Sequence, residues 1–424
     1  MFNCVKGKMK VLNEKGLFHI FGTSVINKIL AFATNIFVVN LLSKSDYGVL
    51  GYSNNIISMF LLFSGLGLTN GILQFCSESR SDKEKKGLYN YGFRSGMIIN
   101  FIIGIFILLF GKYGPIKIKE ARIYIMMLFL MPVVQYLFEY ISAVLRTKRM
   151  NKQFALVQNL NVFTYFILSM LGAYKFGIIG VIIGRYIAFI ITCIFEILIF
   201  KDIRGEIFNN IKISKNIKIE ILKYSFVCSA SNSISQLLYL LDTFFIGLII
   251  ASETSIASYQ VATLIPNALL FIPMNLMVFI YPYIAERKEN RKWIKEKYFK
   301  LLKYLGIINS LIGITLFVCA HIIINIIWGQ DYLDSILPFR ILSLSYIISA
   351  TLRIPAGNIL SMIRKARVNL YISIISGISN IILDILLIKL WGGVGAAIAN
   401  ILVVIISSIM AVTYLSIYLY EKKN

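Results

Sequence analysis

Acidic side chains and histidines are scarce in this sequence. Its 424 residues include 20 Asp and Glu against 43 Lys and Arg, and its only histidines are His19 and His321. None of the five cysteines belongs to a CxxC or CxxH motif, so we expect neither a disulfide framework nor a zinc site. GxSxG, HExxH and P-loop motifs are also missing, which argues against an enzyme, against ATP hydrolysis by this chain and against a resident cofactor.

Charged residues of both signs are few. They make up 15% of the chain, against about 25% in soluble proteins, while 58% is hydrophobic and the mean hydropathy is +0.77. Many apolar runs reach the roughly 20 residues that a helix needs to cross a bilayer. The sequence therefore predicts an all-α polytopic membrane protein with twelve spans, near 17–42, 47–76, 91–111, 122–145, 153–173, 178–200, 220–249, 257–284, 298–327, 335–362, 369–390 and 394–420.

The positive charges alternate between the connections. They are densest in "ERKENRKWIKEK" at 286–297, whereas the loops at 251–256 and 328–334 contain no Lys or Arg, and only 112–122 departs from the alternation. Cytoplasmic loops carry such an excess. We therefore expect both termini in the cytoplasm. Nucleic acid is not expected as a partner, despite the net charge of +23, because no dedicated basic domain is present.

An internal repeat is suggested by two matching patterns. A basic turn, "LRTKRMNKQF" at 145–154 or "SMIRKARVNL" at 361–370, is followed by a glycine pattern, "KFGIIGVIIG" or "LWGGVGAAIA". Two six-helix halves, 1–205 and 206–424, would explain the match, and chance similarity between apolar segments is the alternative. A shift of 215 residues aligns Gly177 with Gly392, Gly180 with Gly395, Arg149 with Arg364 and Lys152 with Arg367.

Several segments together resemble the Wzx-type polysaccharide flippases, within the larger superfamily that includes the MATE multidrug exporters. The resemblance covers nearly the whole chain, and the segment near the C-terminus is the most specific. The residues that carry it are "LLSKSDYGVLGYSNNI", "SGLGLTNGILQFCSE", "LLDTFFIGLIIASETSIASYQVA" and "GNILSMIRKARVNLYISIISGISNIILDILLIKLWGGVGAAIAN".

The resemblance implies a MATE-like fold of two lobes around a central cavity, in the bacterial cytoplasmic (inner) membrane. The implied substrate is an oligosaccharide, an O-antigen or capsule repeat unit, linked by pyrophosphate to undecaprenol. It would cross the membrane by alternating access, coupled to H+ or Na+. Membrane lipids, a polysaccharide polymerase and a chain-length regulator are the further partners that the resemblance implies.

Cations inside the spans are candidates for binding an anionic head group, because a charge at a helix centre costs about 2.5–3.5 kcal/mol even on the translocon scale. Lys28 lies about 16 Å into its span, and Arg353 about 13 Å. Pro355 is expected to disturb the helix beside Arg353. Arg185 and Arg340 lie nearer the outer surface, where snorkelling is the alternative. A structural pair with Asp242 is the alternative for Lys28.

The intramembrane acids are candidates for ion coupling. Asp242, in "LLYLLDTFFIGL", is surrounded by apolar residues, so its carboxyl would take up a proton or pair with a cation. Glu139 and Asp384 are further candidates, although Lys389 is near enough in sequence to form a structural pair with Asp384. Glu196, close to the end of its span, is expected to reach the interface.

Two other functional classes remain open. A MATE-type drug or cation exporter would favour a cavity without excess positive charge, and dependence of activity on an added cationic drug would identify it. A polysaccharide polymerase or ligase would need a large outside loop, but the predicted outside loops have at most about 11 residues. A lipid II flippase is a closer alternative, but lipid II flippases are longer chains with two additional spans.

Overall fold

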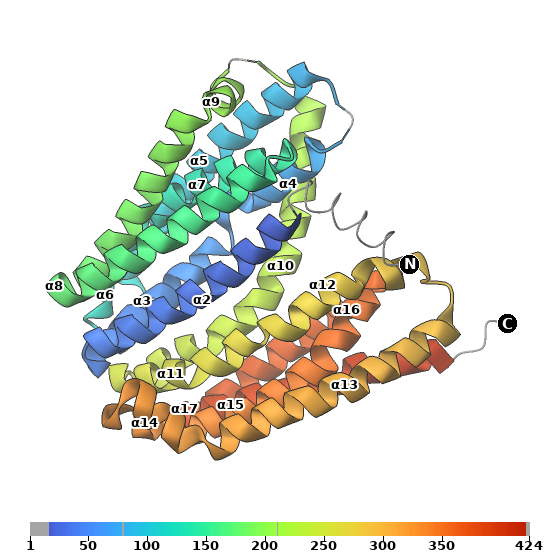
Figure 1. Cartoon of the computed structure of the whole chain (residues 1–424). Helices are drawn as coiled ribbons and strands as arrows, with labels where there is room; N and C mark the ends of the chain where they lie inside the picture. Colours follow the sequence, from blue (N-terminus) through green and yellow to red (C-terminus); the bar gives the residue numbers. More distant parts are fainter. Residues whose placement is uncertain (1–16, 79, 210, 421–424) are drawn as a thin grey trace. The chain divides into compact units, whose positions relative to one another are not determined.

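The computed structural model describes residues 17–78, 80–209 and 211–420, and the regular structure in those ranges is helical (Figure 1). The predicted cytoplasmic basic residues at the two ends of the chain lie outside the described residues. The helices are α2 Leu17–Leu41, α3 Lys44–Leu61, α4 Leu68–Phe75, α5 Asp82–Tyr113, α6 Ala121–Met127, α7 Met131–Thr147, α8 Asn151–Ile199, α9 Lys201–Ile207, α10 Lys215–Ile249, α11 Glu253–Leu269, α12 Phe271–Glu286, α13 Arg291–Val318, α14 Ala320–Trp328, α15 Ile336–Ile348, α16 Ile354–Met362 and α17 Ala366–Tyr420.

Nine helical stretches within the described ranges are long and apolar enough to cross a membrane, and α10 contributes a shorter apolar segment, Gln236–Ile249. Large apolar side chains project from these helices; Ile98 is 62% exposed and Ile326 is 77% exposed. Water would not tolerate so much apolar surface, whereas lipid does. The prediction of an all-helical, multi-pass membrane protein is confirmed. The count of twelve spans and the orientation stay predictions.

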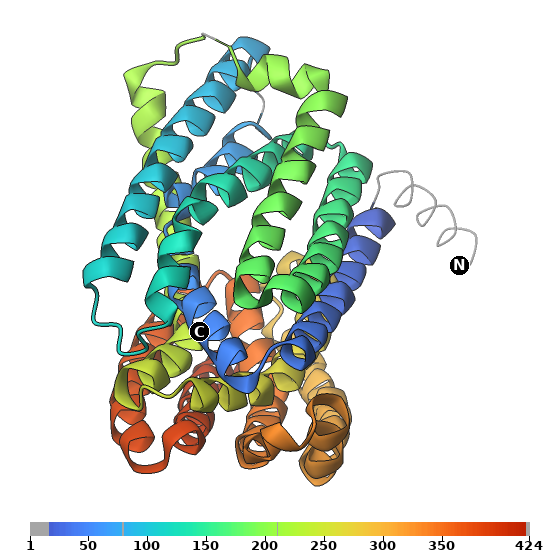
Figure 2. The same cartoon turned by 90° about the vertical axis from the view of Figure 1, so that its left-hand side faces the viewer.

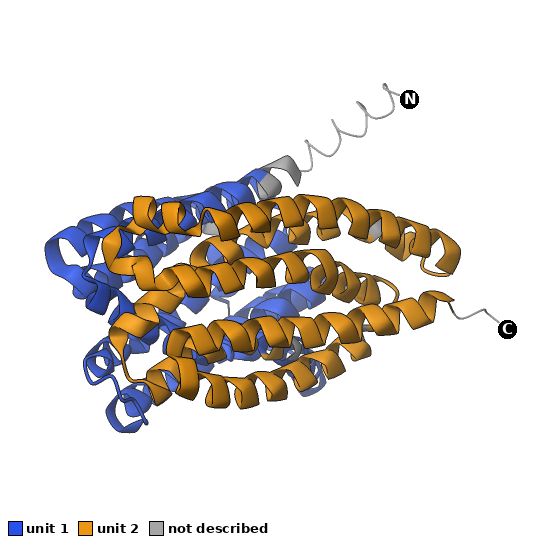
Figure 3. Ribbon diagram, turned by 90° about the horizontal axis from the view of Figure 1, so that it is seen from below, with its two compact units in different colours: residues 1–233 blue, residues 234–424 orange. Residues whose placement is uncertain are grey.

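The chain packs as two compact units, residues 1–233 and 234–424 (Figure 3). The division falls inside α10. This division reflects which residues contact one another in the structure, whereas the predicted halves, 1–205 and 206–424, follow the repeat in sequence. Those halves stay predictions.

The two longest helices each turn back on themselves at a glycine. Gly177 in α8 has φ 58° and ψ −137°, and Gly392 in α17 has φ 60° and ψ −134°. These are positions where a side chain would strain the backbone. The two arms of α8 lie side by side (green in Figure 2), and Asn161 of the first donates to Thr192 of the second at 3.2 Å. The equal backbone angles at aligned positions agree with the predicted 215-residue shift.

Close contact between the arms of α8 depends on glycine. A Cβ on Gly180 would lie 2.0 Å from the carbonyl oxygen of Gly172. We expect Gly180→Ala to destabilise unit 1 by about 1–3 kcal/mol, as overpacking generally does. Thermal unfolding in detergent would measure the loss. Gly205→Ala is the matched control, because a Cβ there meets nothing within 4 Å. Equal stability of the two variants would contradict the prediction.

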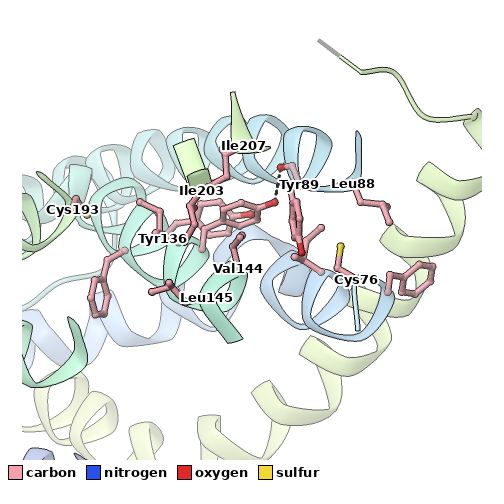
Figure 4. Close-up of a cluster of buried hydrophobic side chains, with 14 of the residues drawn as sticks. Cys76, Leu88, Tyr89, Tyr136, Val144, Leu145, Cys193, Ile203 and Ile207 are labelled. Atoms are coloured by element: carbon pink, nitrogen blue, oxygen red, sulfur yellow. Dashed lines mark hydrogen bonds between the residues drawn. The ribbon is translucent and has the colours of Figure 1, made fainter. Parts of the chain in front are cut away.

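The core of unit 1 is built on tyrosines that reach backbone carbonyls (Figure 4). Tyr136 and Tyr140 of α7 are fully buried, and their hydroxyls donate to the carbonyls of Gly92 at 2.8 Å and Tyr89 at 2.6 Å. Gly96 leaves the space that the Tyr136 ring fills. Spacing of small residues by four brings helices together in this way within membranes, and the buried hydroxyls are satisfied.

The basic segment 112–122, the exception to the charge alternation, has a structural explanation at Arg122. Its guanidinium donates to the carbonyls of Gly111, Lys112, Gly114 and Ile116 at 2.8–3.3 Å. A cation at the end of α5 also meets the negative end of that helix. One of the positive charges in this segment is therefore used to close the turn between α5 and α6.

Candidate functional site

A buried polar cluster surrounds Asp242 in unit 2. The Asp242 side chain is 2% exposed, and its carboxylate accepts hydrogen bonds from Tyr259 of α11, from Asn380 at 3.1 Å and from Asn400 at 3.2 Å. Ser345 of α15 in turn donates to the amide oxygen of Asn400 at 2.8 Å. All three donors to the carboxylate are neutral, so they orient the carboxylate without cancelling its charge.

The second acid of this cluster is Asp384. It is fully buried and interacts with Asp242, but neither of its oxygens has a hydrogen-bond donor among the described residues. The amide oxygen of Asn380 also lacks a donor there. Two buried carboxylates side by side repel each other, and buried oxygens without donors are costly. A proton or a small cation held between these oxygens would relieve both problems.

Helix geometry explains how the cluster is assembled. Asn380 and Asp384 are four residues apart on the first arm of α17 and so share one face. Asn400 lies beyond the turn at Gly392, on the second arm. Sequence reasoning found the two acids and missed Tyr259, Asn380 and Asn400. The four-residue spacing in "NIILD" was the one available signal. The expected Asp384–Lys389 pair was wrong, because Lys389 is exposed whereas Asp384 is buried against Asp242.

Glu139 and Arg185 lie in a second polar cluster, in unit 1. Gln135 donates to Glu139 at 2.7 Å within α7, and Arg185 of α8 donates to Asn54 of α3 at 3.2 Å. Arg185 lies within electrostatic reach of Glu139, although no ion pair joins them among the described residues. The structure thus brings one predicted cation and one predicted acid together, and their functional roles stay predictions.

The prediction for Glu196, near the C-terminal end of α8, is wrong. We expected it at the membrane interface, but it is 1% exposed. Ser142 donates to it at 3.5 Å, and its second oxygen has no partner among the residues described. The prediction failed because α8 packs on α7 at this point, which encloses a residue that position in the span alone would leave near the surface.

Arg353 lines a polar cavity in unit 2 with a volume of about 250 Å³. Its guanidinium carbon lies 5.8 Å from the centre of the Tyr239 ring, a cation–π geometry. Asn358, Asn369 and Ser373 contribute amides and a hydroxyl to the walls, and no acidic residue lines the cavity within the described part of the chain. The cavity offers one positive charge surrounded by neutral hydrogen-bonding groups.

The backbone beside Arg353 is irregular, as expected from Pro355. Residues Ser349–Arg353 form a π-helical turn, and Pro355 stands at the start of α16. Proline cannot donate to the preceding turn, and such π-turns often occur at functional sites. Arg353 also lines a smaller hollow whose wall includes Asn400. Asn400 is a donor to Asp242, so the smaller hollow and the acid cluster share this residue.

Lys28 belongs to unit 1, and Arg340 belongs to unit 2 but does not line the Arg353 cavity. Lys28 is an exposed residue of α2, with no ion-pair partner among the described residues. Arg340 of α15 donates to the carbonyl of Phe317 at 3.2 Å and lies over the Phe317 ring. That carbonyl is in the last turn of α13, where a cation is favourable. Substrate binding by either residue stays a prediction.

The sequence matches one family model and one relative among known proteins. A family model described as "Polysaccharide biosynthesis protein" matches residues 37–337. An uncharacterised membrane protein of Methanocaldococcus jannaschii is 22% identical over 400 residues, which cover 88% of this chain and 78% of that protein.

Solved structures agree on the fold. The lipid II flippase MurJ, in an inward closed conformation, has a TM-score of 0.76 and 16% identity over 94% of this chain and 87% of its own. An inward-facing multidrug resistance MATE family transporter of the MOP superfamily has a TM-score of 0.76 and 15% identity, over 92% of this chain and 95% of its own. A MOP superfamily transporter from Pyrococcus furiosus has a TM-score of 0.62 and 15% identity, over 96% of both chains. Likeness at these identities shows the fold alone.

Proposed function

Because the chain belongs to the polysaccharide biosynthesis protein family, we propose that it is a flippase for an oligosaccharide linked by pyrophosphate to undecaprenol. The O-antigen or capsule repeat unit would pass from the inner to the outer leaflet by alternating access. The proposal takes α8 and α17 as two spans each and α10 as one, which gives twelve. Both termini would then lie in the cytoplasm of a bacterial cell.

The observation that carries this proposal is the chemistry of the Arg353 cavity. An arginine is suited to phosphate because its planar guanidinium donates two parallel hydrogen bonds. The amides and hydroxyls of Asn358, Asn369 and Ser373 suit sugar hydroxyls in the same way. A cationic drug would meet a positive charge here and no acid in the described lining, so the cavity favours an anionic head group over a MATE-type substrate.

Ion coupling is the second part of the proposal, and it rests on Asp242 and Asp384. The carboxylate oxygens of these two residues can take up a proton. Together with the amide oxygen of Asn380 they can also bind a hard cation such as Na+. Loading or unloading an ion there would change the hydrogen bonds of Asn400, which also lines the hollow beside Arg353. Glu139 remains a further coupling candidate, beside Arg185 in unit 1.

Transport in proteoliposomes tests the proposal. The purified chain would be reconstituted with a fluorescent polyprenyl-pyrophosphate-linked oligosaccharide, and movement between leaflets would be followed by quenching from outside. We expect an imposed Na+ or proton gradient to accelerate the movement. Empty liposomes and liposomes challenged with ethidium are the controls. Ethidium transport without movement of the lipid would overturn the proposal in favour of a drug exporter.

A further inference from the structure

A basic groove lies at the end of unit 2 where α16 passes into α17. We define it by Arg364, Lys365, Arg367, Tyr371 and Tyr414, with apolar walls from Val368, Ile372 and Met410. Its volume is about 880 Å³, far more than a phosphate ion needs. Both arms of α17 contribute walls, so the groove follows the packing of the hairpin and not one surface loop.

The charges of this groove are available to a ligand. Arg364 and Arg367 are exposed, and no carboxylate in the described residues forms an ion pair with any of the three cations. The Nζ atom of Lys365 lies 5.4 Å from the centre of the Tyr418 ring. Three positive charges without an acid form an anion-binding surface.

The aligned basic turn of unit 1 serves as a comparison for the groove. Arg149 and Arg364 share the left-handed backbone, with φ of 59° and 63°. In the unit 1 turn, however, Lys148 pairs with Glu206 at 2.5 Å, and Arg146 lies over the Phe154 ring. Orientation in the membrane explains basic residues in both turns. It does not explain the large groove beside the cations of the unit 2 turn.

The walls identify the ligand as amphipathic. Tyr371 is 64% exposed and Tyr414 is 38% exposed, and both tyrosines stand beside the apolar Val368 and Met410. Tyrosine is suited to the level of lipid head groups, because its ring is apolar and its hydroxyl is polar. A phosphate against the arginines and a hydrocarbon chain along the walls would satisfy both parts of the groove.

The groove also adjoins the Arg353 cavity. Ile372 lines both, and Ser361 and Asn369 of the cavity wall are close in sequence to Arg364 and Arg367. We propose that the basic groove is a loading site for the polyprenyl phosphate part of the lipid-linked substrate, from which the head group passes Ile372 to reach Arg353. The inference rests on the proposed function, because it takes its lipid from there.

Binding of undecaprenyl phosphate to the purified full chain, measured by native mass spectrometry, tests the loading site. We expect the double variant Arg364→Gln/Arg367→Gln to weaken binding about tenfold, since each lost charge-assisted hydrogen bond counts. The matched control is Arg149→Gln/Lys152→Gln, which removes two charges at the aligned positions and is expected to change binding less than about twofold. Equal losses in the two double variants would overturn the inference.

A second variant avoids the strained turn. Arg367→Gln changes one exposed residue in the first turn of α17 and is expected to weaken binding about threefold. Unchanged binding in a folded Arg367→Gln chain would count against the loading site. Equal affinity for phosphatidylglycerol would also overturn the proposal, by making the groove a general phospholipid site. Full competition by inorganic phosphate alone would also overturn the proposal, because it would show that the groove does not recognise the polyprenyl hydrocarbon.

The two proposals fail separately. Arg353→Ala is expected to leave undecaprenyl phosphate binding intact, because Arg353 does not line the groove. Binding that depends on the groove, in a chain that moves no lipid in proteoliposomes, would remove the proposed function and keep the anionic-lipid site. Lipid movement with groove-independent binding would remove the loading site and keep the flippase.

Discussion

Arg353→Ala is expected to lower export of the polysaccharide about a hundredfold while leaving the chain inserted and folded. The cavity of about 250 Å³ has this one charge among its described lining residues. Two hydrogen bonds to an anionic head group, each contributing about 1.5–3 kcal/mol, would disappear with the guanidinium. The measurements are surface polysaccharide in cells and lipid movement in proteoliposomes, with expression level checked in parallel.

Two further substitutions sharpen this result. Arg353→Lys keeps the charge without the planar fork and is expected to retain partial transport, about a tenth of the normal rate. Arg340→Ala is the matched arginine variant, and loss of its bond to the Phe317 carbonyl is expected to lower thermal stability first. An equal loss of transport in folded Arg340→Ala would support the sequence-based prediction that Arg340 also binds substrate.

Lys28 provides a comparison from unit 1. The depth of Lys28 in its predicted span predicts that Lys28→Ala abolishes surface polysaccharide, and its exposed position on α2 leaves the amine open to a ligand. Normal polysaccharide in both Lys28→Ala and Arg353→Ala would remove the assignment of these cations to the substrate site.

Asp384→Asn is expected to uncouple transport from the ion gradient without destabilising unit 2. The amide has nearly the shape of the carboxyl but neither carries the exchangeable proton nor neutralises a cation. Removing one of two adjacent buried carboxyls also relieves repulsion with Asp242. Thermal unfolding should therefore occur at the same or a higher temperature, while the acceleration by Na+ or by protons is lost.

The control for Asp384→Asn is Asp331→Asn, which changes an exposed acid of the same unit. Separate Na+ and proton gradients, imposed on proteoliposomes of each variant, would show which ion is coupled. A fully gradient-driven Asp384→Asn chain would exclude this cluster as the coupling site. The same experiment on Glu139→Gln would then decide whether the acid of unit 1 carries the ion.

Much of the local structure followed from residue types and their spacing. Apolar runs of helical length predicted the membrane helices. Pro355 predicted the irregular turn that places Arg353, and the glycine patterns aligned two turns that prove to have equal backbone angles at Gly177 and Gly392. Each of these depends on steric limits of a few adjacent residues, which are written in the chain itself.

The partners of the charged groups did not follow. Asp242 and Asp384 are 142 residues apart, and nothing local indicated that α10, α11 and α17 would bring them together with Tyr259 and Asn400. Lys389, the near neighbour of Asp384 in sequence, is exposed, whereas Asp384 is buried. Depth in a span also misjudged Glu196, which packing against α7 encloses.

The sequence by itself determined that the chain is a multi-pass membrane protein, because the cost of burying charge and unsatisfied backbone in lipid leaves few alternatives to apolar helices. Only the tertiary structure decided which charges are paired, which are enclosed and which line a cavity. The reason is physical: the cost of each charge depends on the groups within a few ångströms of it, and those groups come from helices that are distant along the chain.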